Sequence, residues 1–344
     1  MTIDIHNHNK AALLPLRRAL YDYEPEAVRQ ALHAVFRADA QVFLATPFEQ
    51  LDGPKGLYHQ VFEPLSRAVP DLERRDTIVM AGPGAVDGDW VGCCGYYTGT
   101  FVRPWMEIPS TGRQVSLRFH EFYRMEGGKV AEMQALWDIP ELMLQAGAWP
   151  MAPSLGREWH VPGPATQDGL VAGPRDPARS QASRQLVQDM LAGLAQFSTG
   201  GVAAMELEKY WHPRFSWYGP SGIGTARGIE GFRNWHQIPF LNGMPDRQGT
   251  GGKGNFFADG DYVGFTAWPG MRATISGDGW LGIAPSGQQI TMRSLDFWRC
   301  ENGLIRENWV LVDLLHVFRQ IGVDVLGRMR EFNKLRGPSH HDSR

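Results

Sequence analysis

The chain has 344 residues, of which 43% are hydrophobic and 21% are charged, and its formal net charge is -3. These values are typical of a folded protein long enough for two domains, and they exclude a disordered chain. Lys and Arg form no run longer than a pair, so we expect no nucleic-acid partner.

The spacing of the cysteines and the lack of long apolar stretches indicate the cellular compartment of the protein. Cys93 and Cys94 are adjacent and a third cysteine is distant, a spacing that fits neither a disulfide framework nor a zinc site. The N-terminal MTIDIHNHNK has no apolar signal region, and nowhere are there roughly 18 consecutive apolar residues. We therefore expect a cytoplasmic protein with no metal site and no membrane partner.

The sequence contains an internal repeat. Residues 108–148 align without a gap on residues 283–323 at a constant offset of 175. Further upstream, DGDWVG at 87–92 matches DGDYVG at 259–264 at an offset of 172, so the second copy contains a short insertion. Such self-similarity predicts two copies of one structural unit.

The repeat sets the domain boundaries. We expect a first domain over residues 20–148 and a second over residues 183–326. The intervening segment 149–182 is rich in Pro, Gly, Ala and Ser and has no apolar periodicity, which is typical of a linker.

The order of elements within each copy predicts the fold class. A helix opens each copy, with Pro25 in the first turn of one and Ser183 as the N-cap of the other. Later, Gly127-Gly128 and Asn302-Gly303 are typical two-residue hairpin turns between β-rich runs. Helices followed by an antiparallel meander predict two α+β domains.

The strand before each hairpin turn carries an acid on an apolar face. Because side chains alternate along a strand, every second residue shares a face. These faces hold Val115, Leu117, Phe119, Glu121 and Tyr123 in one copy and Ile290, Met292, Ser294, Asp296 and Trp298 in the other. Burial raises the pKa of an unpaired carboxyl group and suits it to proton transfer near neutral pH. We therefore expect Glu121 and Asp296 to lie in pockets.

The strand after each turn carries further acids. One face holds Val130, Glu132, Gln134, Leu136 and Asp138, and its counterpart holds Ile305, Glu307, Trp309, Leu311 and Asp313. Glu132 and Glu307 either serve a pocket or pair with arginines of the sheet. Asp138 and Asp313 precede helical patterns, so they either cap helices or carry catalysis, and the two roles are compatible.

Several aromatic residues and histidines are candidates for the pocket wall. His236 lies with Phe232 and Trp235 on one side of a predicted helix. His120 points away from Glu121 in a regular strand, which favours a structural or interfacial role. Aromatic side chains line cavities or fill cores. The candidates for ligand contact are Trp309, Trp298, His236, Tyr218, Trp235 and Phe265.

The acids, arginines and glycine turns of each copy occur in an order that is typical of a known protein family. The segment TGRQVSLRFHEFYRMEGGKVAEMQALWDIPELMLQAG resembles the closing segment of the SnoaL-like polyketide cyclases, a branch of the nuclear transport factor 2-like superfamily. PSGQQITMRSLDFWRCENGLIRENWVLVDLLHVFRQIG in the second copy is similar in the same features. These are a Gly turn, a strand with an acid and an Arg, an Ile/Val-x-Glu strand, and an Asp before a helix ending in Gln-x-Gly.

The resemblance implies a fold, a ligand and a chemistry. Each copy would form a curved antiparallel sheet wrapped over helices into a cone that takes a small hydrophobic ligand. Members commonly pair sheet to sheet, which a tandem chain can do within itself, and a homodimer is a further possibility. In the cyclases an Asp moves protons for an aldol ring closure without metal or organic cofactor. By motif position the candidates are Asp313 and Asp138, with Asp296 and Glu121 as second acids.

The two copies depart from the family pattern to different degrees. Where the family often has Glu-His-Trp, the first copy reads Glu132-Met133-Gln134 and the second reads Glu307-Asn308-Trp309. The second copy keeps the Trp, so we prefer it as the active half.

Two functions of different classes follow from this reasoning. The first is a cofactor-free cyclase, isomerase or lyase that transfers a proton beside a carbonyl of a small, hydrophobic or polyketide-like substrate. The second is a non-catalytic protein of the same fold that binds a small molecule or serves as a scaffold. A third, a metal-dependent barrel with His6 and His8 as ligands, conflicts with the antiparallel hairpin signals.

Overall fold

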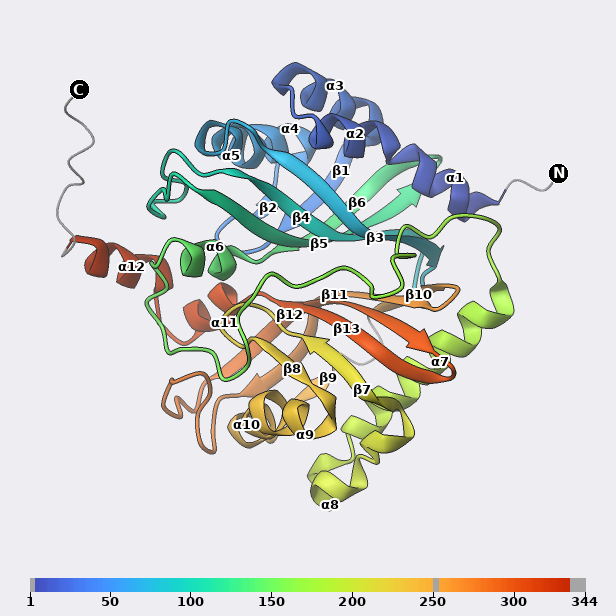
Figure 1. Cartoon of the computed structure of the whole chain (residues 1–344), viewed down its shortest axis with the longest axis vertical. Coiled ribbons are helices and arrows are strands. Elements are labelled where there is room, and N and C mark those ends of the chain that lie inside the picture. The colour runs from blue at the N-terminus through green and yellow to red at the C-terminus, as the bar shows by residue number, and fades with distance from the viewer. Residues whose placement is uncertain (1–3, 250–253, 335–344) are drawn as a thin grey trace.

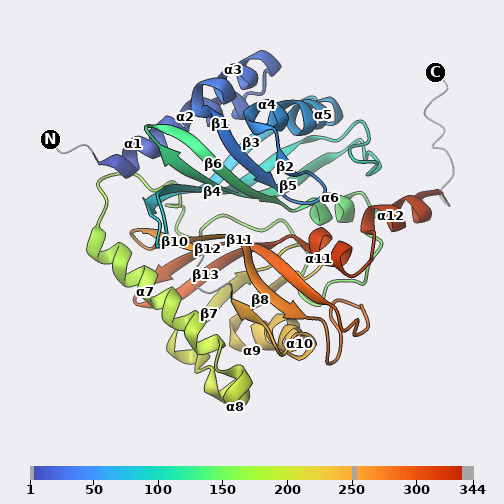
Figure 2. The ribbon, with the colours of Figure 1, turned by 180° about the vertical axis from the view of Figure 1, so that it is seen from behind.

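The computed structural model describes residues 4–249 and 254–334. Two α+β domains follow one another, and their sheets face each other across the middle of the molecule (Figure 1). From behind, helices cover the outer side of each sheet (Figure 2). Within these residues, every helix is too short or too polar to span a bilayer.

Domain 1 consists of helices on the outside and a six-stranded sheet of order β2-β1-β6-β5-β4-β3. The pair β1 and β6 is parallel and the other pairs are antiparallel. Its helices are α1 (Ile5–Ala12), α2 (Leu14–Tyr21), α3 (Pro25–Val35), α4 (Gly53–Leu57), a π-helical turn (Tyr58–Phe62), α5 (Glu63–Ala68) and α6 (Ile139–Gln145). Its strands are β1 (Phe36–Leu44), β2 (Glu49–Leu51), β3 (Glu73–Pro83), β4 (Asp89–Thr100), β5 (Gln114–Glu126) and β6 (Lys129–Trp137).

Domain 2 repeats this plan with the order β10-β11-β12-β13-β7-β8, and β9 pairs with β11. Its strands are β7 (Trp211–Tyr218), β8 (Thr225–Arg227), β9 (Gln248–Gly249), β10 (Asn255–Asp259), β11 (Tyr262–Thr274), β12 (Gln289–Glu301) and β13 (Leu304–Val312). Its helices are α7 (Pro177–Leu194), α8 (Phe197–Ala204), a 3-10 turn (Leu207–Lys209), α9 (Gly228–Phe232), a π-helical turn (Arg233–Gln237), α10 (Ile238–Gly243), α11 (Leu314–Gln320) and α12 (Val325–Lys334).

Local sequence signals explain where helices α3 and α7 begin. Helix α3 starts at Pro25, as predicted. Helix α7 starts at Pro177, not near Ser183, because Asp176 accepts a hydrogen bond from the Arg179 N–H and caps the helix well before Ser183. Ser183 is instead a buried residue within the helix.

Both predicted hairpin turns are present. Gly127 and Gly128 have φ of 56° and 76°, and Asn302 and Gly303 have φ of 51° and 75°. Two consecutive residues with positive φ give the turn a twist that matches the flanking strands. These turns fix the register of β5 with β6 and of β12 with β13.

The insertion predicted in the second copy widens β11. Ala267 pairs with Ser294 and Met271 with Met292, so residues 268–270 stand opposite Arg293. In domain 1, Tyr96 alone stands opposite Arg118. The chain bulges at this point, and Trp268 covers the Arg293 guanidinium, which lies 4.6 Å from the ring centroid.

The two sheets pack against each other through aromatic side chains. Phe122 stacks on Phe297 at 4.8 Å between ring centroids, and Phe257 meets Phe122 edge-on at 5.7 Å. His120 Nδ1 lies 2.6 Å from the Leu295 carbonyl oxygen, which confirms its predicted interfacial position. Burying each such side chain contributes roughly 1.5–3 kcal/mol. The tandem chain thus forms a sheet-to-sheet pair within itself.

The linker is an ordered part of this interface. Leu170 bridges to Val79 of β3, and Arg157 bridges to Thr225 of β8, so the linker pairs with an edge strand of each sheet. The Tyr96 hydroxyl donates to the Val161 carbonyl oxygen at 3.0 Å. The linker therefore protects edge strands and ties the two domains together.

Candidate functional site

Each sheet has one face that is turned towards the outer helices of its domain. We call these faces cone 1 and cone 2. Cone 1 carries the β5 side chains Phe119, Glu121 and Tyr123, and cone 2 carries the equivalent β12 side chains Ser294, Asp296 and Trp298. The predicted faces are confirmed for these strands, since their large apolar members belong to the domain cores.

The acid of cone 1 is fully satisfied. Glu121 is 0% exposed, and the Arg74 guanidinium donates to it at 2.5 Å. The hydroxyl groups of Tyr97 and Tyr123 donate at 3.1 and 2.6 Å, and the Trp137 indole N–H donates at 2.9 Å. The carboxylate thus has a cation and three further donors as hydrogen-bond partners. Glu121 therefore serves a structural network.

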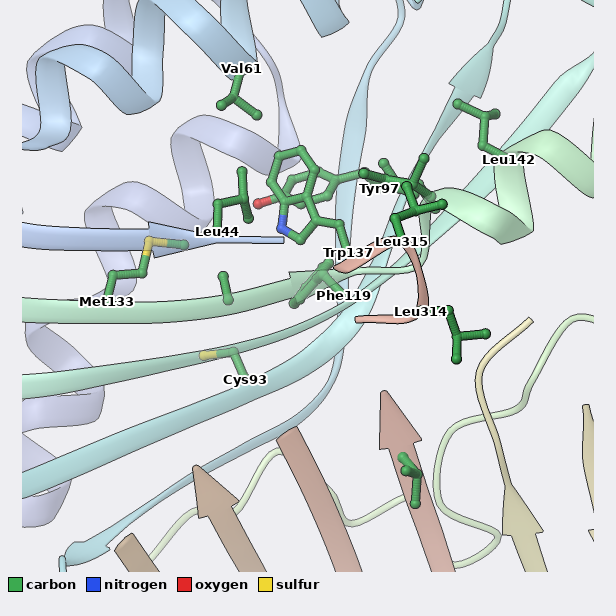
Figure 3. Packing of buried hydrophobic residues seen from close by; sticks show 14 of the residues in the cluster. Leu44, Val61, Cys93, Tyr97, Phe119, Met133, Trp137, Leu142, Leu314 and Leu315 are labelled. Carbon is green, nitrogen blue, oxygen red and sulfur yellow. The ribbon is translucent and has the colours of Figure 1, made fainter. Parts of the chain in front are cut away.

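Cone 1 is also filled by its own side chains. Trp137 and Tyr97 lie together at 4.7 Å between ring centroids, and Phe62 from the helical side packs on Trp137 at 5.7 Å. Figure 3 shows Trp137 and Tyr97 enclosed by Leu44, Val61 and Phe119. Tyr97, Phe119 and Trp137 are 2, 0 and 3% exposed, so a ligand has no access to Glu121.

Cone 2 lacks the partners that satisfy the acid in cone 1. In domain 1, Arg74 pairs with Tyr97, and Tyr97 pairs in turn with Leu117. In domain 2, Gly249 pairs with Met271, and Met271 pairs in turn with Met292. Val312 faces Ser294 as Trp137 faces Phe119. The replacements are therefore Arg74 by Gly249, Tyr97 by Met271, Tyr123 by Trp298, Trp137 by Val312 and Phe119 by Ser294.

Asp296 is consequently buried without a charged partner. It is 9% exposed, its nearest donor is the Ser294 hydroxyl at 3.5 Å, and its Oδ1 atom has no hydrogen-bond partner. No described residue forms an ion pair with it. Burial raises the pKa of Asp296 well above its ordinary value, because nothing compensates the ionised form. Asp296 is thus a carboxyl group whose ionised form is disfavoured by burial.

His236 is the second titratable group of cone 2. It stacks on Trp217 at 3.9 Å with an angle of 14° between the rings, and its Nδ1 atom is buried without a partner. Trp217, Asn308 and Trp298 form one row of paired residues across three strands. Asp296 lies two residues from Trp298 on the same face of β12. Because His236 stacks on Trp217, it lies over the row next to Asp296. Burial lowers the pKa of His236 to about 3, and the imidazole is neutral.

Buried polar atoms without partners gather in cone 2. Besides Asp296 Oδ1 and His236 Nδ1, they include Trp298 Nε1 and the Oε1 atom of Gln237, which takes the place of Phe62 in the repeat. Among the described residues, the equivalent positions of cone 1 contain no such atom. Buried polar groups without partners are costly and rare, so their concentration here indicates a place for a polar ligand.

Cone 2 is also more open than cone 1. Ser294, Met271 and Val312 are partly exposed, whereas their larger counterparts in cone 1 are buried. Phe265 stands beside Asp296 on the neighbouring strand and is partly exposed as well. The structure thus brings together four of the predicted residues, namely Asp296, Trp298, His236 and Phe265.

Comparison with known proteins agrees with this architecture. The family model of the SnoaL-like polyketide cyclases matches residues 17–146 and 188–321. The chain belongs to this family. It is a tandem member, because each match spans one domain, and the resemblance predicted from the sequence is confirmed. No curated protein matches the chain.

Two solved structures from Streptomyces are similar to part of this chain. AclR from Streptomyces galilaeus is 21% identical with a TM-score of 0.36, and the similarity covers 43% of this chain and 90% of AclR. IdmH from Streptomyces antibioticus is 18% identical with a TM-score of 0.33, and the similarity covers 40% of this chain and 98% of IdmH.

The two aspartates selected by the SnoaL-like motif lie at the domain interface. Asp313 accepts hydrogen bonds from the Thr46 N–H at 2.9 Å and the His316 N–H at 3.0 Å, and Arg293 lies 3.2 Å from it. It therefore caps α11 and binds domain 1. These contacts give Asp313 a structural role, and the catalytic role expected for it stays a prediction.

Asp138 mirrors this arrangement in the opposite direction. It accepts a hydrogen bond from the Ser221 N–H of domain 2 at 2.9 Å, and Arg118 lies 3.1 Å from it. Unlike Asp313, it makes no hydrogen bond that caps its helix, α6. One aspartate side chain of each domain thus accepts a hydrogen bond from a backbone N–H of the other domain.

Three predicted ligand-contact residues lie outside cone 2. The Trp309 indole donates to the Pro162 carbonyl oxygen of the linker at 2.9 Å, and the Tyr218 hydroxyl donates to Glu307 at 3.1 Å. Both belong to the interdomain cluster. Trp235 is 51% exposed on the outer π-helical turn. These three side chains therefore do not join the group in cone 2, and their contact with a ligand stays a prediction.

A register shift explains the misplaced tryptophan. The pairing of β12 with β13 shifts between Arg299 and Cys300, so Ile305 points to the domain core while Trp309 and Leu311 point to the interface. Alternation counted from Ile305 thus assigns Trp309 to the wrong face. Glu307 pairs with Arg299 at 2.6 Å and Glu132 with Arg124 at 3.3 Å, which confirms the structural alternative for these acids.

A cavity beside α10 does not coincide with the unpaired polar groups. Its volume is about 650 Å³, and it lies between α10 and the loop at 278–284. Asp296 does not line it. Trp280 does, and Trp280 also packs on Phe240, which in turn contacts His236 at 5.5 Å. We place the candidate site in cone 2, because unpaired buried polar atoms require a partner and surface hollows do not.

Proposed function

We propose that this tandem SnoaL-like chain is a cofactor-free cyclase or isomerase whose chemistry takes place in cone 2 of domain 2. Its substrate would be a small, hydrophobic, polyketide-like carbonyl compound. The observation that carries the proposal is the contrast between Asp296, which has no charged partner, and Glu121, which has a cation and three further donors.

Asp296 would move the proton. A raised pKa makes the carboxylate form of Asp296 a stronger base than an ordinary aspartate, so it can take a proton from the carbon beside a carbonyl group. The resulting enolate then attacks a second carbonyl carbon in a cyclase, or receives the proton at another carbon in an isomerase. In either case Asp296 returns the proton and the cycle closes.

The neighbouring groups would stabilise the charge that develops on the carbonyl oxygen. Trp298 Nε1 is a donor without a partner, and it is available to the ligand oxygen. His236 is neutral, so it contributes a hydrogen bond without an added charge. Domain 1 would support the active half through the interface.

Proton exchange at carbon tests this proposal without knowledge of the product. Hydroxylated aromatic ketones would be incubated with the protein in heavy water, and deuterium uptake beside the carbonyl would be followed by NMR. We expect Asp296→Asn to slow protein-catalysed exchange by about 100-fold or more, in the range of general-base contributions. The matched control Tyr97→Phe removes one donor in cone 1 and should leave exchange unchanged.

The outcomes separate an enzyme from a binding protein. If the ligands bind to cone 2 and no exchange above background occurs, the chain is a non-catalytic binding protein of the same fold. If exchange persists in Asp296→Asn, the proton-transfer role assigned to Asp296 is wrong.

A further inference from the structure

We propose that a second ligand site lies between the two domains and binds a small organic cation, a guanidinium or ammonium compound with an apolar body. The site is a cavity of about 480 Å³, which we call the seam cavity. It is separate from the face that carries Asp296, so the proposal does not depend on the proposed function. Its lining includes Glu141 and Leu144 of domain 1, Glu158, Trp159 and His160 of the linker, and Ser221 of domain 2.

The first argument is a buried acid that lines this cavity. Glu141 is 8% exposed, and its Oε2 atom accepts a hydrogen bond from the Arg118 N–H at 2.7 Å. No described residue donates to its Oε1 atom or forms an ion pair with its carboxyl group. Burial and the charge of the neighbouring Asp138 raise the pKa of Glu141 well above its ordinary value. A cation in the cavity would stabilise the ionised form.

Glu158 of the linker is the second acid of the cavity. It accepts hydrogen bonds from the Ser221 hydroxyl at 3.0 Å and from the Gly222 N–H at 2.9 Å. These bonds fix the position of the carboxylate, and no described residue forms an ion pair with it. The seam cavity therefore presents two acids, one from a domain and one from the linker, to a ligand.

The positively charged or titratable groups around the cavity do not compensate these acids. Arg118 lies 3.1 Å from Asp138 and forms its ion pair there. Arg157 lies over the Trp159 ring, 5.0 Å from the ring centroid, and pairs with neither acid. Burial lowers the pKa of His160, so its imidazole is neutral at pH 7. The described groups thus leave an excess of negative charge that a ligand cation would balance.

The repeat relates the seam cavity to the opposite end of the domain interface. Thr46 occupies the position of Ser221 in the first copy, and the backbone N–H of each donates to an aspartate at 2.9 Å. The Thr46 hydroxyl donates to Glu49 at 3.0 Å, as the Ser221 hydroxyl donates to Glu158. Glu49 and Glu158 therefore take corresponding places at the two ends.

The opposite end contains the cation that the seam cavity lacks. Arg293 and Arg319 lie 2.6 and 2.5 Å from Glu49. Arg319 belongs to α11, and the constant offset of the repeat places Leu144 of α6 at its position. An apolar side chain thus replaces the guanidinium that pairs with the acid at the other end. A ligand guanidinium or ammonium group would supply this missing partner.

The walls of the cavity define the rest of the ligand. Trp159 is 41% exposed and Leu144 is partly exposed, and both line the cavity. Contact with these side chains removes apolar surface from water and favours a cation that carries a ring or a short alkyl chain.

A matched ligand pair tests the charge preference of the seam cavity. Benzylguanidine and benzylurea share an aromatic ring and a planar head group, and they differ in charge at neutral pH. Binding to the full chain would be measured by calorimetry. We expect benzylguanidine to bind about tenfold more tightly or better, the scale of one charge-assisted hydrogen bond.

Four variants locate the binding. Glu141→Gln keeps an acceptor for the Arg118 N–H and should remove most of the charge preference. Glu158→Gln, at an exposed position, provides the same test if Glu141→Gln fails to fold. Leu144→Arg places a guanidinium where Arg319 lies in the second copy, so it should abolish the binding of benzylguanidine. Glu49→Gln is the matched control at the opposite end and should leave the affinity within about twofold.

Three results would overturn the inference. They are equal or tighter binding of benzylurea, binding of neither compound, and benzylguanidine binding that survives Leu144→Arg. The last result would place the cation elsewhere, for example beside Asp296 in cone 2. Proton exchange depends on Asp296 and not on the seam cavity, so a failure of the proposed function is measured separately.

Discussion

Glu121 and Asp296 occupy equivalent positions on β5 and β12, opposite Ala135 and Val310, yet only Glu121 is surrounded by donors. The same backbone position therefore holds a carboxyl group with a cationic partner in domain 1 and a carboxyl group without one in domain 2. In cone 1 the carboxylate is part of a buried ionic network that stabilises the domain. In cone 2 the carboxyl group is left unpaired, which costs stability and suits a site that meets a ligand.

Removing the charge of Asp296 should stabilise the protein. The pKa of Asp296 is raised above its ordinary value of 3.8, so the folded state holds a proton that the unfolded state releases. Stability therefore falls as pH rises from the unfolded pKa towards the folded one. We expect Asp296→Asn to raise the free energy of unfolding at pH 7 by about 1–3 kcal/mol. Urea unfolding at pH 7 and pH 3 tests this, since the gain should vanish at the lower pH.

His236 should make the protein sensitive to acid. Its pKa falls from an ordinary 6.5 to about 3 in the folded state, so the unfolded state binds the proton first. Stability is then constant above pH 6.5 and declines as pH falls through the window down to about 3. His236→Phe keeps the stack on Trp217 and should flatten this acid-side decline. An unchanged slope in urea unfolding between pH 6 and pH 4 would contradict the assignment, and His33→Phe at an exposed position of α3 is the control.

Features encoded by local sequence were predictable. The hairpin turn is specified by two neighbouring residues of positive φ, Asn302 and Gly303. The constant offset of the repeat places Asp296 at the position of Glu121. The insertion was also visible as a change of offset, although its place in β11 was not. Alternation then put Asp296 and Trp298 on one face correctly, because β12 is regular between them.

Features that depend on contacts between distant segments were not predictable in this way. The side chain of Asp313 binds Thr46, which is 267 residues away in the chain. Trp309 points to the interface because of a register shift that leaves no mark in the residue pattern. The contrast between the two cones was equally hidden, since it requires knowing that Arg74 contacts Glu121, which is 47 residues away in the chain.

Arg74 should be essential for domain 1. It is 1% exposed and binds both Glu121 and Asp76, so Arg74→Met leaves buried carboxylates without their cation. We expect a loss of about 3–5 kcal/mol in the free energy of unfolding. The double variant Arg74→Met with Glu121→Gln keeps the hydrogen bonds from Tyr97 and Trp137 and should recover part of this loss. A double-mutant cycle with no coupling would contradict the network.

The interface aspartates distinguish a structural role from a catalytic one. Asp313→Ala removes the cap of α11 and leaves the Thr46 N–H and Arg293 without their acceptor, so we expect a loss of about 2–4 kcal/mol. Asp313→Asn keeps an oxygen that can cap the helix and should cost about 1 kcal/mol. Asp138→Asn is the matched control in the other domain.

Proton exchange measured on the same interface variants decides between the two roles. If the contacts seen in the structure are the whole role of Asp313, Asp313→Asn exchanges protons at a rate within a few-fold of the unmodified chain, as Asp138→Asn does. If Asp313→Asn stays folded and loses exchange by about 100-fold, while Asp138→Asn does not, Asp313 is the base that its motif position predicts. Cone 2 would then use the interface aspartate together with Asp296, and domain 1 would help to build the active site through Thr46.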